Sequence, residues 1–216
     1  MYFPGLPELL SREDAVSVLQ SYLSSETNLM SNQEIDFNIL YARDIVDYLT
    51  LPNTADDEIS LCGTSTTVST PAGSFVSATY NKTWADHGTT YESALAKHER
   101  YHITYPSVTS LRTPAPAYNC HSYAFHSTSS SNLYWIGSPA KYLNDGSYSS
   151  STAAVGRIVV YSVNGSYSHS AIINSTSGGT VVTSKWGCYG LYQHDLRDCP
   201  YAKNVSGLST AVYKRN

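Results

Sequence analysis

Hydrophobic residues recur every three or four positions in two stretches near the start of the chain, within residues 6–50. The second stretch, Ile35 to Leu49, follows Ser31, and both have the spacing of short amphipathic helices. A run of Pro, Asn and Asp residues at 52–57 interrupts the pattern, and Thr, Ser, Val and Gly become more frequent after it. We therefore predict an N-terminal helical segment over residues 1–55, a pro-segment or accessory region, and a separate domain over residues 56–216.

The first half of that domain opens with a strand pattern. β-prone residues at 66–70 and 74–80 flank the turn Pro71-Ala72-Gly73, so we predict a hairpin there. Residues 90–103 return to helical spacing, and Pro106 follows them. One helix is therefore expected before the middle of the chain.

The second half alternates a short helix, loops and strands. We predict a helix from Cys120 to about Ser127, after a proline-rich approach, and a long polar connection over residues 142–154. Three strand patterns follow, and the turn sequences Asn164-Gly165 and Ser177-Gly178-Gly179 separate them. They predict an antiparallel meander over 157–163, 168–173 and 180–186. The fold class is therefore α+β, a helix packed on a small antiparallel β-sheet.

The amino-acid composition indicates the environment in which the protein works and excludes some classes of partner. Only 14% of residues are charged, and the chain has 19 Tyr against 4 Phe, which is typical of an extracellular surface. The net charge is −4 and the basic residues are scattered, so nucleic acid is not an expected partner. No apolar stretch is long enough to span a membrane. The first 25 residues lack the layout of a secretory signal, so either a signal has been removed or the protein is intracellular; we expect a secreted or cell-surface protein.

Cys120 is the most informative residue for chemistry. It follows Pro114 and Pro116 and precedes good packing residues, so we expect it at the N-terminus of a helix, where unpaired amides favour a thiolate. His169 opens a strand pattern further along the chain and is the expected base. The pair predicts a cysteine nucleophile with a depressed pKa.

A third group should orient the imidazole of His169. If the last two strands of the meander pair around a turn near Thr176 or Ser177, His169 faces Ser184 or Lys185, and only Ser184 can accept a hydrogen bond from the ring. His194 is a second candidate for this role and Asp195 a third. The choice between Ser184 and His194 stays open, with a preference for Ser184.

Several motifs carry a family resemblance over residues 60–216. The run Tyr118 to Ala124, the strand Ser168 to Ile173 and the run Ser184 to Gly187 resemble the NlpC-type and CHAP-type papain-like amidases and peptidases. More narrowly, the first and last of these runs, together with Thr70 to Gly73 and Tyr105-Pro106, resemble an uncharacterised group of secreted bacterial proteins. The resemblance implies a papain-like fold and hydrolysis of an amide bond in cell-wall peptide or protein. The expected partner is a peptide or peptidoglycan-like substrate, and a non-catalytic binding or adhesion module on the same fold is the alternative.

Other residues have two interpretations. Tyr118, Trp135 and Trp186 are candidate walls of a substrate groove, or ordinary core residues. The sequence His98-Glu99-Arg100-Tyr101-His102 matches the H-E-x-x-H pattern of zinc peptidases, but no third ligand motif follows, so we expect no metal and no cofactor. Cys188 and Cys199 form either one disulfide or two unpaired thiols, and Cys62 has no evident partner.

Overall fold

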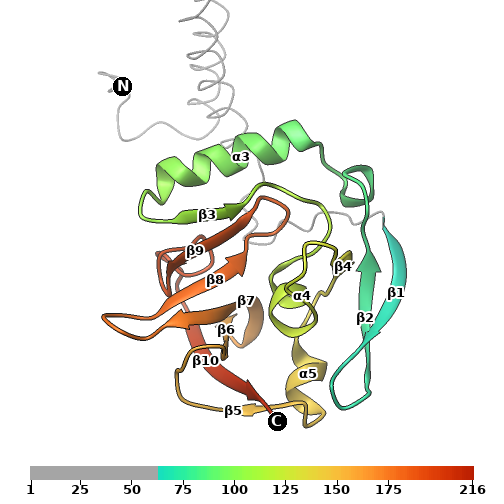
Figure 1. The fold of residues 1–216 in the computed structure, drawn as a ribbon, viewed down its shortest axis with the longest axis vertical. Coiled ribbons are helices and arrows are strands. Elements are labelled where there is room, and N and C mark those ends of the chain that lie inside the picture. The colour runs from blue at the N-terminus through green and yellow to red at the C-terminus, as the bar shows by residue number, and fades with distance from the viewer. Residues whose placement is uncertain (1–62) are drawn as a thin grey trace, which may run out of the picture. The chain divides into compact units, whose positions relative to one another are not determined.

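The computed structural model describes residues 63–216, which form a mixed α+β domain made mostly of β-strands (Figure 1). The expected N-terminal helices, the boundary near residue 55 and Cys62 lie outside the described residues. The α-helices of this part are α3 (Tyr91–Thr104), α4 (Cys120–Phe125) and α5 (Ala140–Asn144), preceded by a 3-10 turn, η1 (Ala85–His87). The strands are β1 (Thr64–Ser69), β2 (Phe75–Tyr80), β3 (Thr109–Arg112), β4 (Tyr134–Trp135), β5 (Tyr148–Ser150), β6 (Ile158–Val163), β7 (Ser166–Ser175), β8 (Val181–Lys185), β9 (Leu191–Asp195) and β10 (Leu208–Arg215).

A seven-stranded sheet in the order β3-β9-β8-β7-β6-β10-β5 forms the centre of the described domain. The predicted meander is confirmed, because β6, β7 and β8 are consecutive antiparallel neighbours. The sheet is larger than the sequence indicated, since β9 continues the meander and β10 returns to pair with β6. The connection predicted over 142–154 is partly ordered structure, because it contains the end of α5 and the strand β5.

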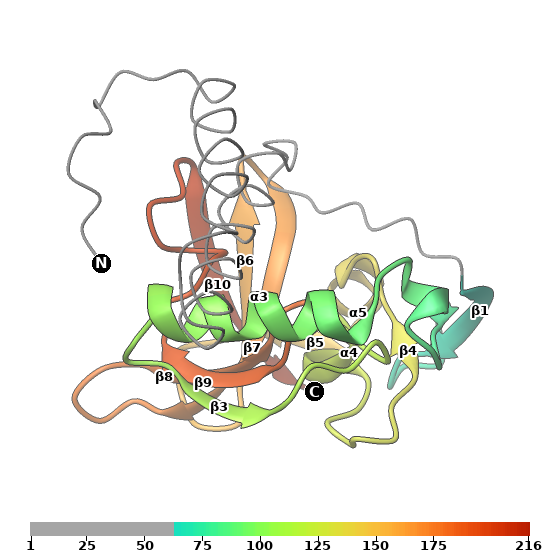
Figure 2. The same ribbon diagram turned by 90° about the horizontal axis from the view of Figure 1, so that it is seen from above.

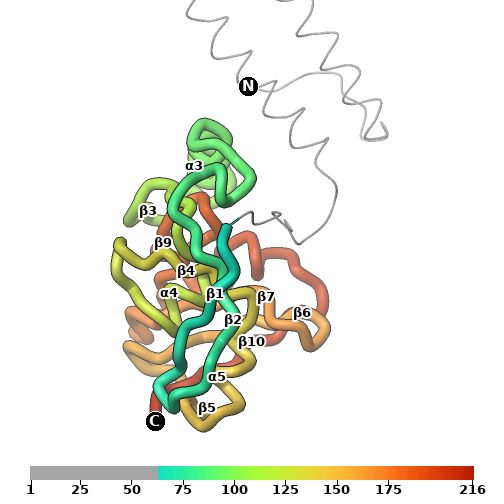
Figure 3. The backbone as a smooth tube through the Cα atoms, turned by 90° about the vertical axis from the view of Figure 1, so that its right-hand side faces the viewer, coloured from blue at the N-terminus to red at the C-terminus, as the bar shows by residue number. Residues whose placement is uncertain are grey.

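The predicted hairpin and the long helix are also confirmed. In the hairpin Ser69 pairs with Phe75, and Gly73 in the turn has a φ of 87°, which a side chain would strain. The hairpin turn lies close to the start of β5, since the amide of Ala72 donates to the hydroxyl of Ser147 (3.1 Å), and Figure 3 shows the hairpin along this side of the domain. The helix α3 begins where Thr90 caps it, with the Thr90 side chain accepting the amide of Ser93.

The large sheet separates two hydrophobic clusters. One face carries the aromatic cluster around Tyr161, Trp186 and Tyr192, to which α3 adds Tyr101; Figure 2 shows α3 running along this side, above β8 and β9. The other face packs the α4 residues Ala124 and Phe125 against β6 and the β1–β2 hairpin. Adjacent residues of one strand therefore belong to different environments.

Candidate functional site around Cys120

Cys120 is the first residue of α4, as expected from the sequence. Asn119 fixes this start, because its side-chain oxygen accepts the amide of Ser122 (3.0 Å) and its amide group donates to the carbonyl of Ile136 (2.7 Å). Both Asn119 and Cys120 are buried. The Asn cap therefore sets where the helix begins and holds the thiol at its first position.

Cys120 lies where α4 meets β7 and β8, and the neighbouring His121 places its Nδ1 2.8 Å from the Ser170 hydroxyl on β7. The pairing of these strands reaches only as far as Ile172 and Thr183, so Ser170 is the next residue of β7 whose amide points toward β8. The Ser170 amide acts to lower the pKa of Cys120.

The environment of the thiol favours its protonated form. Burial raises the pKa of Cys120 to about 11, although hydrogen bonds from the amides of Ser170, His121 and Cys120 itself and the charge of Lys185 lower it. The prediction of a depressed pKa was therefore wrong for this state of the protein. The reason is that α4 has only six residues and the Cys120 residue is 6% exposed, so the loss of solvation outweighs the favourable amides.

His169 precedes Ser170 on β7 and lies on the face of the aromatic cluster. Its ring stacks on Tyr201, with centroids 3.9 Å apart and planes 5° apart, and it lies next to Tyr161 on β6. Both ring nitrogens are buried without a hydrogen-bond partner, so His169 makes no hydrogen bond to Cys120. Burial, followed by the nearby His194 and His121, holds the pKa of His169 well below its usual value, and the ring is neutral.

The candidate orienting groups bond to each other instead of to His169. The Trp186 indole donates to the Ser184 oxygen (3.0 Å), the Ser184 hydroxyl lies 2.8 Å from Nε2 of His194, and Nδ1 of His194 lies 2.7 Å from the carbonyl of Asp195. Each side-chain nitrogen and oxygen in this series of hydrogen bonds has a partner if His194 carries its proton on Nδ1. Burial lowers the pKa of His194 to about 4, which agrees with a neutral ring.

The register explains why Ser184 does not face His169. Ile172 pairs with Thr183 and Ile173 with Val182, two residues away from the register in which His169 lies opposite Ser184. Ser184 and His169 still lie on the same face of the sheet, as expected, because a shift of two residues keeps side chains on the same face. Ser184 thus belongs to the aromatic cluster but is not the partner of the His169 ring.

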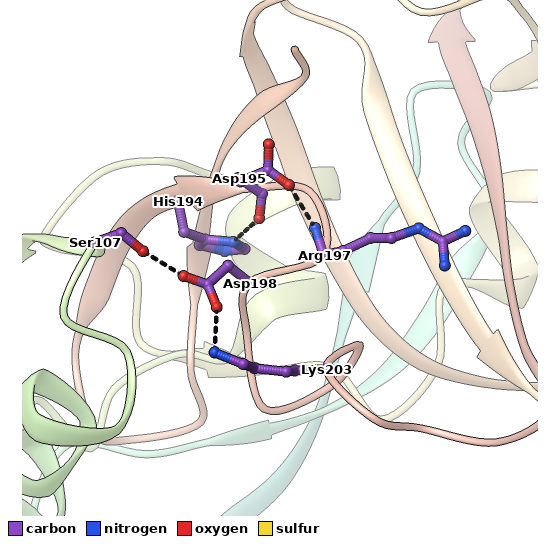
Figure 4. A network of polar contacts seen from close by, with 6 residues as sticks. All are labelled: Ser107, His194, Asp195, Arg197, Asp198 and Lys203. Atoms are coloured by element: carbon purple, nitrogen blue, oxygen red, sulfur yellow. Dashed lines mark hydrogen bonds and ion pairs between the residues drawn. The ribbon is translucent and has the colours of Figure 1, made fainter.

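Asp195, the third candidate, is part of the network that fixes the loop after β9 (Figure 4). Its carboxylate accepts the amide of Arg197 (3.1 Å), while Asp198 accepts from Ser107 and from Lys203, the latter at 2.9 Å. These contacts hold the loop that carries Tyr201 against His169. The Asp195 side chain therefore supports the loop, and only its carbonyl reaches an imidazole, that of His194.

Lys185 is a residue of this site that the sequence analysis set aside. It follows Ser184 on β8, so its side chain lies on the opposite face of the sheet, toward α4, and it is 1% exposed. Its ammonium donates to the carbonyls of Gly187 (2.7 Å) and Ala115 (3.1 Å). Lys185 was excluded because it cannot accept a bond from His169, which is correct, but alternation along β8 places it near Cys120 instead.

The H-E-x-x-H motif lies on α3, where its two histidines, His98 and His102, are one helical turn apart. Nε2 of His98 and Nε2 of His102 are 3.4 Å apart, while Nδ1 of His98 bonds to the Tyr192 hydroxyl and lies 2.9 Å from the carbonyl of Tyr189. Glu99 is exposed. Within residues 63–216 no three His, Cys, Asp or Glu side chains gather as metal ligands.

The aromatic candidates differ in their surroundings. Trp186 is fully buried in the aromatic cluster and Tyr118 is 2% exposed, so in this structure neither side chain lines an open groove. Trp135 is partly exposed and packs edge-on against His87, with centroids 4.5 Å apart. Cys188 and Cys199 are buried free thiols, so the disulfide considered above does not form.

Replacing Ser184 with alanine is expected to lower the free energy of unfolding by about 1–3 kcal/mol, because the Trp186 N–H and the Nε2 of His194 both lose their bond to the hydroxyl and keep only their long contact with each other (3.4 Å). Urea unfolding of Ser184→Ala against Ser209→Ala, an exposed serine on β10, measures this. A Ser184→Ala variant as stable as the Ser209→Ala control would show that the network does not stabilise the fold.

Comparison of the chain with known protein families, with curated proteins and with solved structures finds no match. Among the helices of residues 63–216, none has the length and apolar character needed to cross a membrane.

Proposed function

We propose that this protein is a cysteine hydrolase of papain-like type that cleaves an amide bond in cell-wall peptide or protein, with Cys120 as its nucleophile. The observation that carries the proposal is the position of Cys120 at the first residue of α4, where the main-chain amides of Ser170, His121 and Cys120 itself act to lower the pKa of the thiol. Such amides stabilise negative charge on the sulfur and, after attack, on the carbonyl oxygen of a substrate.

In the proposed reaction the Cys120 sulfur attacks the amide carbonyl carbon and its proton passes to His169. The imidazole returns the proton to the leaving amine, and water then hydrolyses the thioester. His169 suits this role because its ring is neutral and neither nitrogen has a hydrogen-bond partner. It also precedes Ser170, whose hydroxyl lies 2.8 Å from Nδ1 of His121, the residue after Cys120. The ring must first turn away from its stack on Tyr201.

The substrate class and location follow the resemblance given above. We propose a peptide or peptidoglycan-like substrate and a secreted or cell-surface protein, which accords with the low content of charged residues and the high content of tyrosine. Incubation with purified bacterial peptidoglycan, and separately with an unfolded protein, is the test. New amino groups should appear with one of these substrates, and release from neither would reject the proposal.

One observation favours a second candidate, a non-catalytic binding module. At rest the pKa of Cys120 is raised to about 11, and His169 is stacked on Tyr201 instead of bonded to the sulfur. A binding module would co-sediment with insoluble peptidoglycan and release no amino groups. A hydrolase releases them.

A further inference from the structure

His98 and His102 on α3 are the two imidazoles of the H-E-x-x-H sequence, and the proposed reaction does not use them. Residues four apart on a helix share one face, and here the two Nε2 atoms are 3.4 Å apart, with the ring planes at 85° to each other. Two histidine nitrogens that bind one tetrahedral zinc ion, each at about 2.0–2.1 Å, lie about 3.3–3.4 Å from each other. The pair therefore already has the separation of two zinc ligands.

The hydrogen bonds of His98 determine which of its nitrogens carries the proton. Nδ1 of His98 lies 2.9 Å from the carbonyl of Tyr189 and bonds to the hydroxyl of Tyr192, which itself donates to that carbonyl (2.9 Å). Since a carbonyl only accepts hydrogen bonds and the Tyr192 proton is used there, Nδ1 carries the proton of the neutral His98 ring. The Nε2 atom of His98 therefore presents a lone pair toward His102.

The loop before β9 is shaped to hold the His98 ring in this orientation. Gly190 in this loop has a φ of 148°, and a Cβ atom there would lie 2.9 Å from Nδ1 of His98 and 2.8 Å from the Tyr192 hydroxyl, so a larger residue would displace these groups. A main-chain carbonyl that accepts from the second nitrogen of a histidine is a common outer partner of a zinc ligand. The Tyr189 carbonyl occupies this position for His98.

We propose that His98 and His102 form a binding site for a zinc-like divalent cation, with water completing its coordination. Within residues 63–216 no third His, Cys, Asp or Glu side chain joins the pair, so the site binds more weakly than the closed sites of structural zinc proteins. Neutral imidazole suits zinc, copper, nickel and cobalt, whereas magnesium and calcium prefer oxygen ligands. The site is independent of the hydrolase proposed above. Because the helix brings the two rings together, a bound cation stabilises the folded state.

The first test uses the full chain, labelled with nitrogen-15 at histidine and titrated with ZnCl2 at pH 7.5. The Nε2 signals of His98 and His102 should shift together, while those of His126, an exposed histidine outside the pair, should stay unchanged. MgCl2 should shift none of them. Unchanged His98 and His102 signals at excess ZnCl2 would show that the contact is only a hydrogen bond between the rings, and would overturn the proposal.

Two variants then locate the cation by calorimetric titration with ZnCl2. His102→Gln removes one ligand and leaves the contacts of His98 with Tyr189 and Tyr192 in place, so zinc binding should weaken by about tenfold or more, at least the loss that follows removal of an outer partner. His126→Gln should bind zinc like the native chain. Equal affinity in folded His102→Gln and the native chain would overturn the proposal. So would sulfur-to-metal absorption with Co²⁺ in place of zinc, because it would place the cation on a thiol.

Discussion

Cys120→Ala is expected to lower the rate of amide hydrolysis by a factor of about 10³ or more, because removing a nucleophile leaves only binding and the amide donors to act on the substrate. The overall fold should be kept, since alanine at the first position of α4 leaves the Asn119 cap in place. The measurement is the release of amino groups from peptidoglycan or peptide, with circular dichroism to confirm folding. Cys120→Ala with near-native activity would remove Cys120 from the chemistry.

Cys199→Ala is the matched control for the loss of a thiol. Cys199 is also a buried free cysteine, but it belongs to the aromatic cluster and not to the start of α4. The variant is expected to lose some stability through the cavity it creates and to keep its activity at a temperature where it stays folded. Equal loss of activity in both variants would mean that packing, and not nucleophilic attack, explains the effect.

The free energy of unfolding is expected to fall by several kcal/mol between pH 7 and pH 4.5. Four histidines, His87, His121, His169 and His194, are at least 96% buried, and burial lowers the pKa of three of them to about 4 and that of His169 well below its usual value. Below pH 6.5 the unfolded chain binds protons at these sites and the folded chain does not. The contribution of these neutral histidines to the free energy of unfolding is therefore complete above pH 6.5. It falls as the pH is lowered, by up to about 1.4 kcal/mol for each histidine and pH unit.

Urea unfolding at a series of pH values measures this loss, and two variants identify its source. His169→Phe keeps a ring against Tyr201 and removes two buried nitrogens that lack partners, so its stability should depend less steeply on pH. His126→Gln changes an exposed histidine whose pKa burial lowers less than that of His169, so it should reduce the slope less than His169→Phe does. A native protein equally stable at pH 7 and pH 4.5 would contradict the neutral, buried state of these rings.

Local patterns in the sequence were sufficient for the elements that depend on nearby residues. The hairpin follows from its turn, α3 from its Thr90 cap and spacing, and the start of α4 from the residues around Cys120. The strand β10 could not be found in this way. It is largely exposed and is held by pairing with β6 and β5, which are distant in the sequence, and such partners leave no local periodicity.

The pairing register of β7 and β8 could also not be predicted from local sequence patterns. Ser184 and Lys185 lie on opposite faces of β8, as alternation along a strand predicts: Ser184 bonds to Trp186 in the aromatic cluster, and Lys185 to the carbonyl of Ala115 before α4. The loop between these strands, however, is centred on Gly178, later than expected, and Gly178 and Gly179 both have positive φ angles, 72° and 138°. Because of this later turn, the register differs by two residues from the expected one, and Ser184 does not lie opposite His169. The effect of burial on the Cys120 pKa needed the three-dimensional structure, because the neighbours that desolvate a thiol are not adjacent in sequence.

The most direct test of the central claim, that Cys120 is the nucleophile, is mass spectrometry of the intact protein quenched in acid during turnover. An acyl group transferred from the substrate should appear as a mass increase, and peptide mapping should place it as a thioester on the peptide that contains Cys120. The increase should be absent from Cys120→Ala. Turnover of the substrate without any adduct on Cys120, or with the adduct on another residue, would contradict the account.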